Sequence, residues 1–190
     1  SEEFAIEKSL PTQSSPQTLE QAIDVIDQIV TSVKVDLSGL AISVPGTVDT
    51  EEDVIYHGGL LRFFHGFRIK EVLEAKYHLP VMALNDGKAA ALAELATGHL
   101  QGVTNGAALV LGSGLGGGFI INGKLFQGSH FQAGELTFLL PVQMEKVDPS
   151  LMRGMTLSAV GLITEVNEVL GNSDLKDRLA AFKAINAGDK

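Results

Sequence analysis

The sequence predicts an α/β protein, and three observations support that fold class. Segments in which apolar residues alternate as in strands take turns along the chain with segments of helical periodicity, which is the pattern of mixed α/β domains. The chain has 190 residues, and 45% of them are hydrophobic, enough to form a core in one domain or in two small lobes. No internal repeat or low-complexity run interrupts this pattern, so we expect an ordinary globular protein.

The charge and composition exclude several classes of protein. The formal net charge is −9 and no cluster of Lys and Arg occurs, which argues against nucleic acid or an anionic membrane as the main partner. The chain contains no Cys, so disulfide scaffolds, thiolate zinc sites and Cys nucleophiles are excluded together. No basic segment precedes an apolar core at the start, and no apolar stretch approaches the roughly 18 residues of a membrane span. We therefore expect a cytoplasmic enzyme or binding protein.

The first part of the chain is expected to alternate between strands and helices. A short strand is predicted over "FAIEKS", residues 4–9. A helix is predicted over residues 14–33, because apolar residues recur on one of its faces: Leu19, Ala22, Ile23, Ile26 and Val30. The alternating segment "GLAISVPG", residues 39–46, predicts a strand that ends in a tight Pro-Gly loop, and residues 68–78 predict an amphipathic helix.

The second part continues the same alternation. The buried strand "PVMALND", residues 80–86, places Asn85 and Asp86 at its carboxyl end, and an Ala-rich helix is predicted over residues 87–99. Two strands joined by a glycine-rich loop are predicted over residues 106–114 and 117–126. Two helices, over residues 151–170 and 174–188, complete the prediction.

The segment "LGSGLGGGFIING", residues 111–123, contains six glycines. A loop over residues 112–118 lets backbone N–H groups turn inward with no Cβ in the way, and Ser113 adds a hydroxyl donor, an arrangement that suits a polyphosphate. The alternative is a glycine-rich hairpin, or a strand bent against another backbone. The segment is neither a P-loop nor a dinucleotide-binding fingerprint, because no Gly-Lys-Ser/Thr follows and the next element is a strand. Both interpretations stay open on the glycines alone.

Two carboxylates are candidates for chemistry. Asp86 lies directly after a strand and before a helix, at the edge of the sheet where α/β proteins bind ligands, and a carboxylate there can accept a proton from a substrate hydroxyl. The alternative role for Asp86 is the N-cap of the helix, and Asn85 could be a simple turn residue. Glu135, in "HFQAGELTF", is either a binding residue or an ordinary surface Glu.

Taken together, these segments resemble the ROK family, a group of bacterial sugar kinases and sugar-responsive repressors within the actin-like, hexokinase-like ATPase fold. The resemblance is carried by "GLAISVPGTVD" and by "PVMALNDGKAAALAELATGHLQGVTNGAALVLGSGLGGGFIINGKLFQGSHFQAGE", and it runs from Gly39 to Glu135, about half the chain. It implies a two-lobed actin-like ATPase (ribonuclease H-like) fold. The expected small lobe comprises residues 1–98, and residues 99–190 form part of the large lobe.

The resemblance also implies roles for individual residues. Asp86 is implied as the general base toward the 6-hydroxyl of a sugar. Sugar hydroxyls would be bound by residues of three segments: Asn85 and Glu135, Gly46 and Asp49 of the "PGTVD" loop, and His65 and Gly66 of "HGGLLRFFHGFRIKEVLE". The phosphates of ATP, bridged by Mg²⁺, would be contacted by Gly112, Ser113, Gly114 and Gly116.

The sequence departs from some family members at the position of a structural zinc ion. Members with zinc carry a His three residues after the sugar-binding Glu, followed by a Cys-rich cluster. Here that position is Phe138 and Cys is absent, so the chain resembles a zinc-free branch found in Gram-positive bacteria. We therefore expect no structural zinc. Gly87 and Lys88 stand where the family usually has Ala-Asn or Ala-Lys.

A second departure concerns the ends of the chain. Kinases of the family open with a phosphate loop of the Asp-x-Gly-x-Thr type and carry a later glycine-rich segment near the adenosine, and neither occurs in these 190 residues. We therefore expect a fragment that lacks the first strands of the small lobe and the adenosine segment. For the full-length protein the leading hypothesis is ATP-dependent phosphorylation of a hexose or hexose derivative at its 6-hydroxyl.

Two other functions stay open from the sequence. One is a sugar-responsive regulator of the same family, which would need a helix-turn-helix segment that does not precede residue 15 here. The other is a sugar-binding remnant without catalysis. The expected partners are a sugar and ATP, without nucleic acid or membrane, and a homodimer is one of the states that the sequence allows. Glucose, N-acetylmannosamine, fructose and β-glucosides all remain as substrates.

Overall fold

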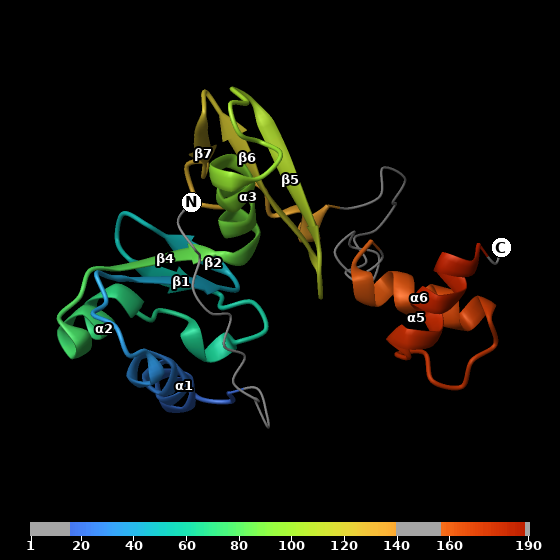
Figure 1. Ribbon diagram of the computed structural model, residues 1–190, viewed down its shortest axis with the longest axis horizontal. Coiled ribbons are helices and arrows are strands. Elements are labelled where there is room, and N and C mark those ends of the chain that lie inside the picture. The colour runs from blue at the N-terminus through green and yellow to red at the C-terminus, as the bar shows by residue number, and fades with distance from the viewer. Residues whose placement is uncertain (1–15, 140–156, 189–190) are drawn as a thin grey trace. The chain divides into compact units, whose positions relative to one another are not determined.

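The computed structural model describes residues 16–139 and 157–188 (Figure 1). The chain divides into two compact units, Ser1–Ala83 and Leu84–Lys190. The strand predicted over residues 4–9 lies outside the described residues, and so does the first part of the helix predicted over residues 151–170.

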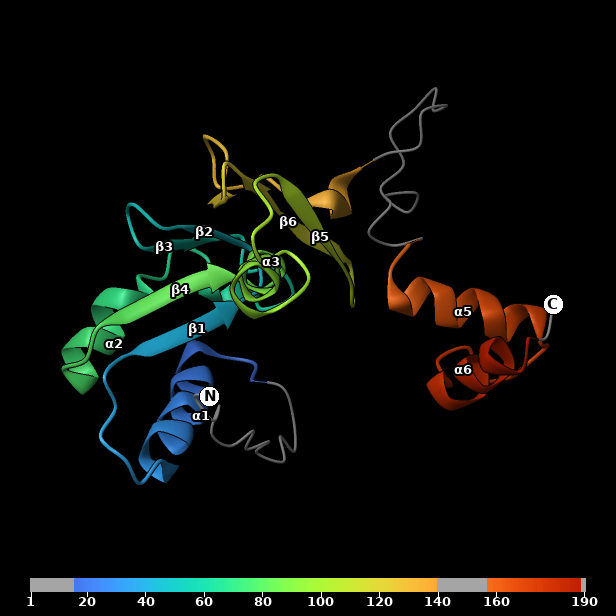
Figure 2. The same ribbon diagram turned by 45° about the horizontal axis from the view of Figure 1, so that its top comes forward.

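The first unit contains two pairs of strands and two α-helices. Strands β1 and β4 pair with each other, and Figure 2 shows them side by side with their arrows pointing the same way. Strands β2 and β3 form an antiparallel hairpin in which Thr47 faces Tyr56 and Asp49 faces Val54. The elements are α1 (Leu19–Ser32), β1 (Leu40–Val44), β2 (Thr47–Asp49), β3 (Val54–Tyr56), the 3-10 helix η1 (Arg62–Phe64), α2 (Ile69–Tyr77) and β4 (Val81–Asn85).

The core of the first unit is formed by the faces that the sequence pattern selects. Helix α1 begins at Leu19, later than predicted, because the Thr18 side chain caps it by accepting the N–H of Gln21. Its predicted apolar face contributes Ala22, with Leu19 and Ile26 packed at the edge of the core. The buried core residues come from every element of the unit: Ala22, Val44, Val48, Ile55, Phe64, Ile69, Leu73 and Val81.

Helices α1 and α2 are joined by two hydrogen bonds to Asp27, and their strength depends on pH. The Lys76 ammonium and the Tyr77 hydroxyl donate to the two oxygens of Asp27, and these bonds lower the pKa of the Asp27 carboxyl. Folding lowers this pKa below 3.8, the ordinary pKa of Asp. The contact therefore stabilises the folded protein fully at pH values above 3.8, and this stabilisation is lost as the pH falls through the pKa of the folded state.

We therefore expect the Asp27→Asn variant to be less stable than the wild type near neutral pH. The difference in free energy of unfolding should disappear in acid, because the wild-type carboxylate is then protonated. Urea denaturation of both proteins, followed by circular dichroism from neutral to acidic pH, checks this. A difference that does not change with pH would contradict it.

The second unit contains a three-stranded antiparallel sheet covered by a helix. The strand order is β5-β6-β7, and α3 packs on this sheet (Figure 1). The elements are α3 (Asp86–Thr97), β5 (Gly106–Leu111), β6 (Leu115–Ile121), β7 (Lys124–Phe126), the 3-10 helix η2 (Leu136–Phe138), α5 (Ala159–Val169) and α6 (Arg178–Ala187). The two strands expected on either side of the glycine-rich segment, β5 and β6, are neighbours in this sheet.

The single strand predicted over residues 117–126 is wrong, because the chain turns within it. Asn122 and Gly123 have φ values of 54° and 72°, and β6 and β7 pair on either side of them, with Ile121 opposite Lys124. An Asn-Gly pair is suited to such a two-residue hairpin turn because both residues tolerate positive φ.

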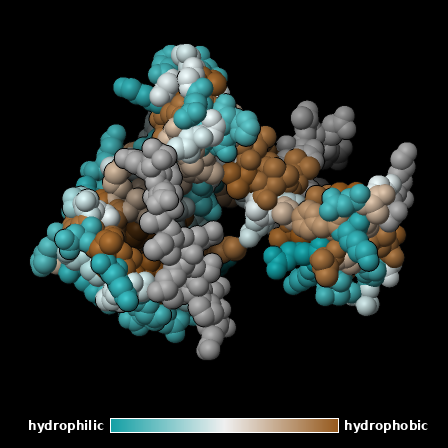
Figure 3. Space-filling view, viewed as in Figure 1, coloured by the Kyte–Doolittle hydropathy of each residue, from teal (hydrophilic) through white to brown (hydrophobic). Residues whose placement is uncertain are grey.

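Helices α5 and α6 pack against each other and are joined by a loop that a buried amide holds in place. The Asn167 side chain is fully buried and donates to the carbonyl of Asp177 at 2.9 Å, while its oxygen accepts from Asn172 at 2.7 Å. Figure 3 shows brown, hydrophobic surface among the polar residues of this helix pair. Apolar side chains that stay exposed there include Leu162, Val169, Leu170, Leu179, Phe182 and Ile185.

The compact units divide the chain earlier than the lobe boundary expected between residues 98 and 99. The break falls between Ala83 and Leu84 because helix α3 packs on the β5-β6-β7 sheet and so belongs with it. The lobe boundary itself stays a prediction. Among the helices of the described residues, none is long and apolar enough to cross a membrane.

Candidate active site

The start of helix α3 separates a capping residue from an exposed carboxylate. Asn85, which is only 5% exposed, ends β4, and its side-chain oxygen accepts the N–H of Lys88 at 3.1 Å. Asn85 is therefore the N-cap of α3, and the alternative interpretation of Asp86 as the cap is wrong. The Asp86 side chain is exposed, and one of its oxygens accepts the N–H of Gly87 at 2.8 Å. A carboxylate that is not needed to begin the helix is thus presented in its first turn.

The capping contact predicts the stability of two variants. Replacing Asn85 with Ala should lower the free energy of unfolding by about 1 kcal/mol, whereas Ser at this position should restore most of the loss because its hydroxyl also caps helices. Urea denaturation of the three proteins measures both differences. Equal stability of the Ala and Ser variants would contradict the capping role.

Glycines bring three segments of this site into contact. A Cβ on Gly87 in α3 would lie 2.6 Å from the Gly117 nitrogen in β6, and a Cβ on Gly134 would lie 2.5 Å from the Gly117 carbonyl oxygen. These distances are shorter than van der Waals contact, so only glycine allows backbones to approach so closely. The residues that follow Gly87 and Gly134 in the chain are Lys88 and Glu135, so these two charged residues lie next to the glycines that contact β6.

Lys88, Glu135 and Asp86 form an electrostatically coupled group. Burial raises the pKa of the Glu135 carboxyl, the charge of Lys88 lowers it, and the charge of Asp86 raises it further. Burial lowers the pKa of the Lys88 ammonium, and Glu135 opposes that shift. Lys88 is completely buried, and its ammonium donates to the carbonyl of Phe131 in the segment before Glu135. The predicted site residues Asp86 and Glu135 are thus brought together, with a cation that sequence reasoning did not place in the site.

The glycine-rich segment is a shorter loop than predicted. Leu111 pairs with Leu115, so the turn between β5 and β6 consists of Gly112, Ser113 and Gly114, with Ser113 exposed. The Gly112 N–H donates to the Gly114 carbonyl within this turn, and the Gly112 carbonyl accepts the N–H of Ala159, where α5 begins.

The predicted loop over residues 112–118 is therefore wrong in its second half. Gly116, Gly117 and Gly118 are residues of strand β6, where the alternative interpretation, a strand packed against another backbone, holds. Contacts of Gly112, Ser113, Gly114 and Gly116 with nucleotide phosphates stay a prediction.

The remaining predicted sugar-binding residues belong to the first unit, and three of them gather around the end of one hairpin. Gly46 has a φ of 93°, and a Cβ there would lie 2.7 Å from the nitrogen of Gly58. His65 stacks on His57 with ring centroids 5.3 Å apart, and its Nδ1 accepts the His57 N–H at 3.1 Å. Gly66 donates its N–H to Ile55 at 2.8 Å. The loops after β1 and β3 and the segment after η1 therefore meet at this end.

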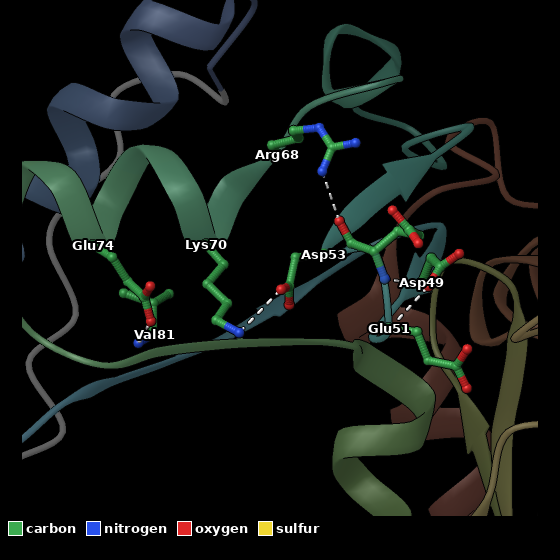
Figure 4. Close-up of polar contacts among 8 residues, drawn as sticks. Asp49, Glu51, Asp53, Arg68, Lys70, Glu74 and Val81 are labelled. Carbon is green, nitrogen blue, oxygen red and sulfur yellow. Dashed lines mark hydrogen bonds and ion pairs between the residues drawn. The ribbon is translucent and has the colours of Figure 1, made fainter.

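Asp49 lies at the other end of β2, in a turn that uses its carboxylate. One oxygen of Asp49 accepts the N–H groups of Glu51 and Glu52, both at 2.9 Å (Figure 4). The turn is tied to the segment around α2, because Arg68 donates to the Glu52 carbonyl and Lys70 pairs with Asp53, each at 3.0 Å. Asp49 thus has a structural role that the sequence prediction did not include, and its role toward a sugar stays a prediction.

The structure gives no metal site in the part of the chain that it describes. Within residues 16–139 and 157–188, no group of three or more His, Cys, Asp or Glu side chains could hold a metal ion. The expected absence of structural zinc stays a prediction, with Phe138 exposed at the position of the zinc-associated His.

Comparison with solved structures defines the class of protein. A ROK glucokinase from Streptomyces griseus, solved in complex with glucose and AMPPNP, matches with a TM-score of 0.73 at 26% identity, covering 92% of this chain and 62% of that chain. A candidate N-acetylmannosamine kinase from Listeria monocytogenes matches with a TM-score of 0.79 at 30% identity, covering 93% of this chain and 61% of that one. The predicted fold class, the α/β actin-like ATPase fold, is confirmed.

The family follows from the sequence match. The model of the ROK family matches residues 1–147, so the chain belongs to the ROK family. The chain is also 40% identical over 119 residues to a β-glucoside kinase from Listeria monocytogenes, an alignment that covers 60% of this chain and 40% of that protein. The chain therefore spans less than half the length of this curated relative.

Proposed function

We propose that the full-length protein is an ATP-dependent sugar kinase that phosphorylates a hexose or hexose derivative at its 6-hydroxyl. The observation that carries this proposal is the exposed Asp86 carboxylate in the first turn of α3, with Asn85 as the cap and Glu135 coupled to it. Membership of a family whose matched relatives include a β-glucoside kinase and a glucokinase supports the same reaction class.

Asp86 has the chemistry that this reaction requires. A sugar hydroxyl is a poor nucleophile, and a carboxylate within hydrogen-bond reach accelerates its attack by accepting the proton, by roughly 10²–10⁴ in rate. Asp86 is exposed, so a substrate hydroxyl can reach it. Glu135 and the buried Asn85 are proposed to accept and donate hydrogen bonds to other hydroxyls of the sugar, together with Gly46, Asp49, His65 and Gly66 of the first unit.

We propose that the turn between β5 and β6 binds a polyphosphate. The glycines at positions 112 and 114 place no Cβ in this turn, and the exposed Ser113 adds a hydroxyl donor. When bound, ATP supplies the phosphoryl group and Mg²⁺ offsets its charge. We propose that Gly112, Ser113, Gly114 and the adjoining Gly116 hold the phosphates.

The remaining properties follow the same proposal. We infer a cytoplasmic protein whose partners are a sugar and ATP, and the net charge of −9 supports the absence of a nucleic-acid partner. A sugar-responsive regulator would bind DNA, and the negative net charge does not favour that function. A homodimer is a further proposal, which sedimentation of the full-length protein tests.

A substrate panel tests the proposed function. The full-length protein is mixed with ATP, Mg²⁺ and one of glucose, N-acetylmannosamine, fructose or cellobiose, and release of ADP is followed by a coupled assay. We expect sugar-dependent ADP release with at least one member of the panel. Binding of a sugar without ADP release would identify a non-catalytic sugar-binding protein and overturn the proposal.

A further inference from the structure

The side chain of Lys88 is a buried cation within the candidate active site. It is 0% exposed, although lysine is almost never fully buried without a partner. Its ammonium donates to the carbonyl of Phe131, which is 43 residues away in the chain. Phe131 has a φ of 55°, an uncommon conformation for a bulky residue, so the carbonyl that Lys88 binds belongs to a backbone held in a specific turn. Lys88 thus joins the start of α3 to the segment that leads to Glu135.

The Lys88 ammonium also acts on the charge of Glu135. Within residues 16–139 and 157–188, the charged groups that act on Glu135 are Lys88 and Asp86, both in the first turn of α3. Strand β6, which also contacts η2, presents only uncharged residues over Leu115–Ile121, and His130 of the preceding segment is exposed. Lys88 is therefore the cation that opposes both the burial of Glu135 and the negative charge of Asp86.

We propose that Lys88 is a positioning residue for the sugar site: its buried ammonium, by binding the Phe131 carbonyl, holds the segment that leads to Glu135 and offsets the negative charges of Glu135 and Asp86. An ionised Glu135 accepts hydrogen bonds from sugar hydroxyls at both oxygens, whereas a protonated one loses part of that capacity. This role rests on the proposed function, and it adds a residue that neither touches the sugar nor takes part in proton transfer.

Two variants separate the hydrogen bond from the charge. Lys88→Met removes both and keeps an unbranched side chain, while Lys88→Gln removes the charge and retains a donor for the Phe131 carbonyl. Lys88→Gln is the variant expected to keep the fold, because its amide can still donate to the Phe131 carbonyl. Lys88→Met leaves that carbonyl without its donor and should be the less stable of the two. Lys124→Met is the matched control, since Lys124 is exposed on β7 of the same unit and loses the same charge.

The first measurement needs no sugar. Carbon-13 NMR of the full-length protein with labelled Glu follows the titration of the Glu135 carboxyl, assigned with Glu135→Gln. Removing Lys88 removes the charge that lowers the Glu135 pKa, so the midpoint of the Glu135 titration should rise in both Lys88 variants and stay unchanged in the Lys124→Met control. An unchanged Glu135 midpoint in Lys88→Met and Lys88→Gln would overturn the proposal.

The second measurement connects the charge to binding. In calorimetric titrations with the best sugar of the substrate panel, the loss of sugar affinity in acid should begin at a higher pH in the Lys88 variants than in the wild type. Identical pH profiles in all four proteins would overturn the positioning role. If the wild type releases no ADP with any sugar, the proposed function fails on its own, while the Glu135 titration still decides the role of Lys88.

Discussion

An Asp86→Asn variant of the full-length protein should keep its fold and its sugar affinity but lose at least about a hundredfold in turnover. The substitution preserves shape and removes the proton acceptor. Because Asn85 caps α3, the change at position 86 leaves the cap intact, and an Asn oxygen can still accept the Gly87 N–H. Steady-state ADP release, calorimetric sugar binding and thermal melting of the variant and the wild type measure the three quantities.

Asp174→Asn is the matched control for this experiment. Asp174 is also exposed in the second unit, and one of its oxygens accepts a backbone N–H, that of Lys176, at 2.9 Å. Asp174 lies in the loop before α6, outside the proposed site. The turnover of the Asp174→Asn variant should therefore equal that of the wild type. An Asp86→Asn protein that turns over at the control's rate with its sugar bound would show that Asp86 is not the base.

Replacing Gly117 with Ala should cause a large loss of stability. The added Cβ would lie 2.5 Å from the carbonyl oxygen of Ala108 in the neighbouring strand β5, and a backbone atom cannot move aside as a flexible side chain can. Overpacking of this kind lowers the free energy of unfolding by typically 1–3 kcal/mol, and the same shift would push β6 away from Gly87 and Gly134. Urea denaturation followed by circular dichroism measures the effect.

The neighbouring glycine provides the control for crowding. A Cβ on Gly116 would meet only the Cα of Gly87 at 3.8 Å, which is ordinary contact, in the same strand. Gly116→Ala should therefore stay within about 0.5 kcal/mol of the wild type, as surface substitutions usually do. Equal destabilisation at positions 116 and 117 would mean that glycine in β6 matters for backbone freedom rather than for close approach.

The regular elements could be predicted because their signals are local. Helix α1 follows from apolar residues on one face, and β1 and β5 follow from alternation over five and six residues. The turn at Asn122 and Gly123 also has a local signal, the Asn-Gly pair, although the apolar segments on both sides of it favour one continuous strand. The β2–β3 hairpin has strands of only three residues each, too short for a periodic pattern to appear.

The site could be predicted only in part, because its decisive contacts are long-range. Local pattern placed Asp86 at the start of a helix but could not decide which of two adjacent polar residues caps it. The contact between Lys88 and Phe131 joins residues 43 apart, and no spacing rule indicates it. The same holds for the β6 glycines, whose need for close approach depends on Gly87 and Gly134, segments that the fold alone brings together.

A single-turnover measurement tests the central claim, that Asp86 takes the proton from the sugar 6-hydroxyl during phosphoryl transfer. The full-length protein, saturated with its best sugar, is mixed with limiting ATP labelled at the γ-phosphate, and label on the sugar is followed after rapid quenching. We predict transfer to the 6-oxygen in the wild type, none to the 6-deoxy sugar, and transfer slowed at least about a hundredfold in Asp86→Asn. Transfer at the wild-type rate in Asp86→Asn, or to the 6-deoxy sugar, would contradict the account.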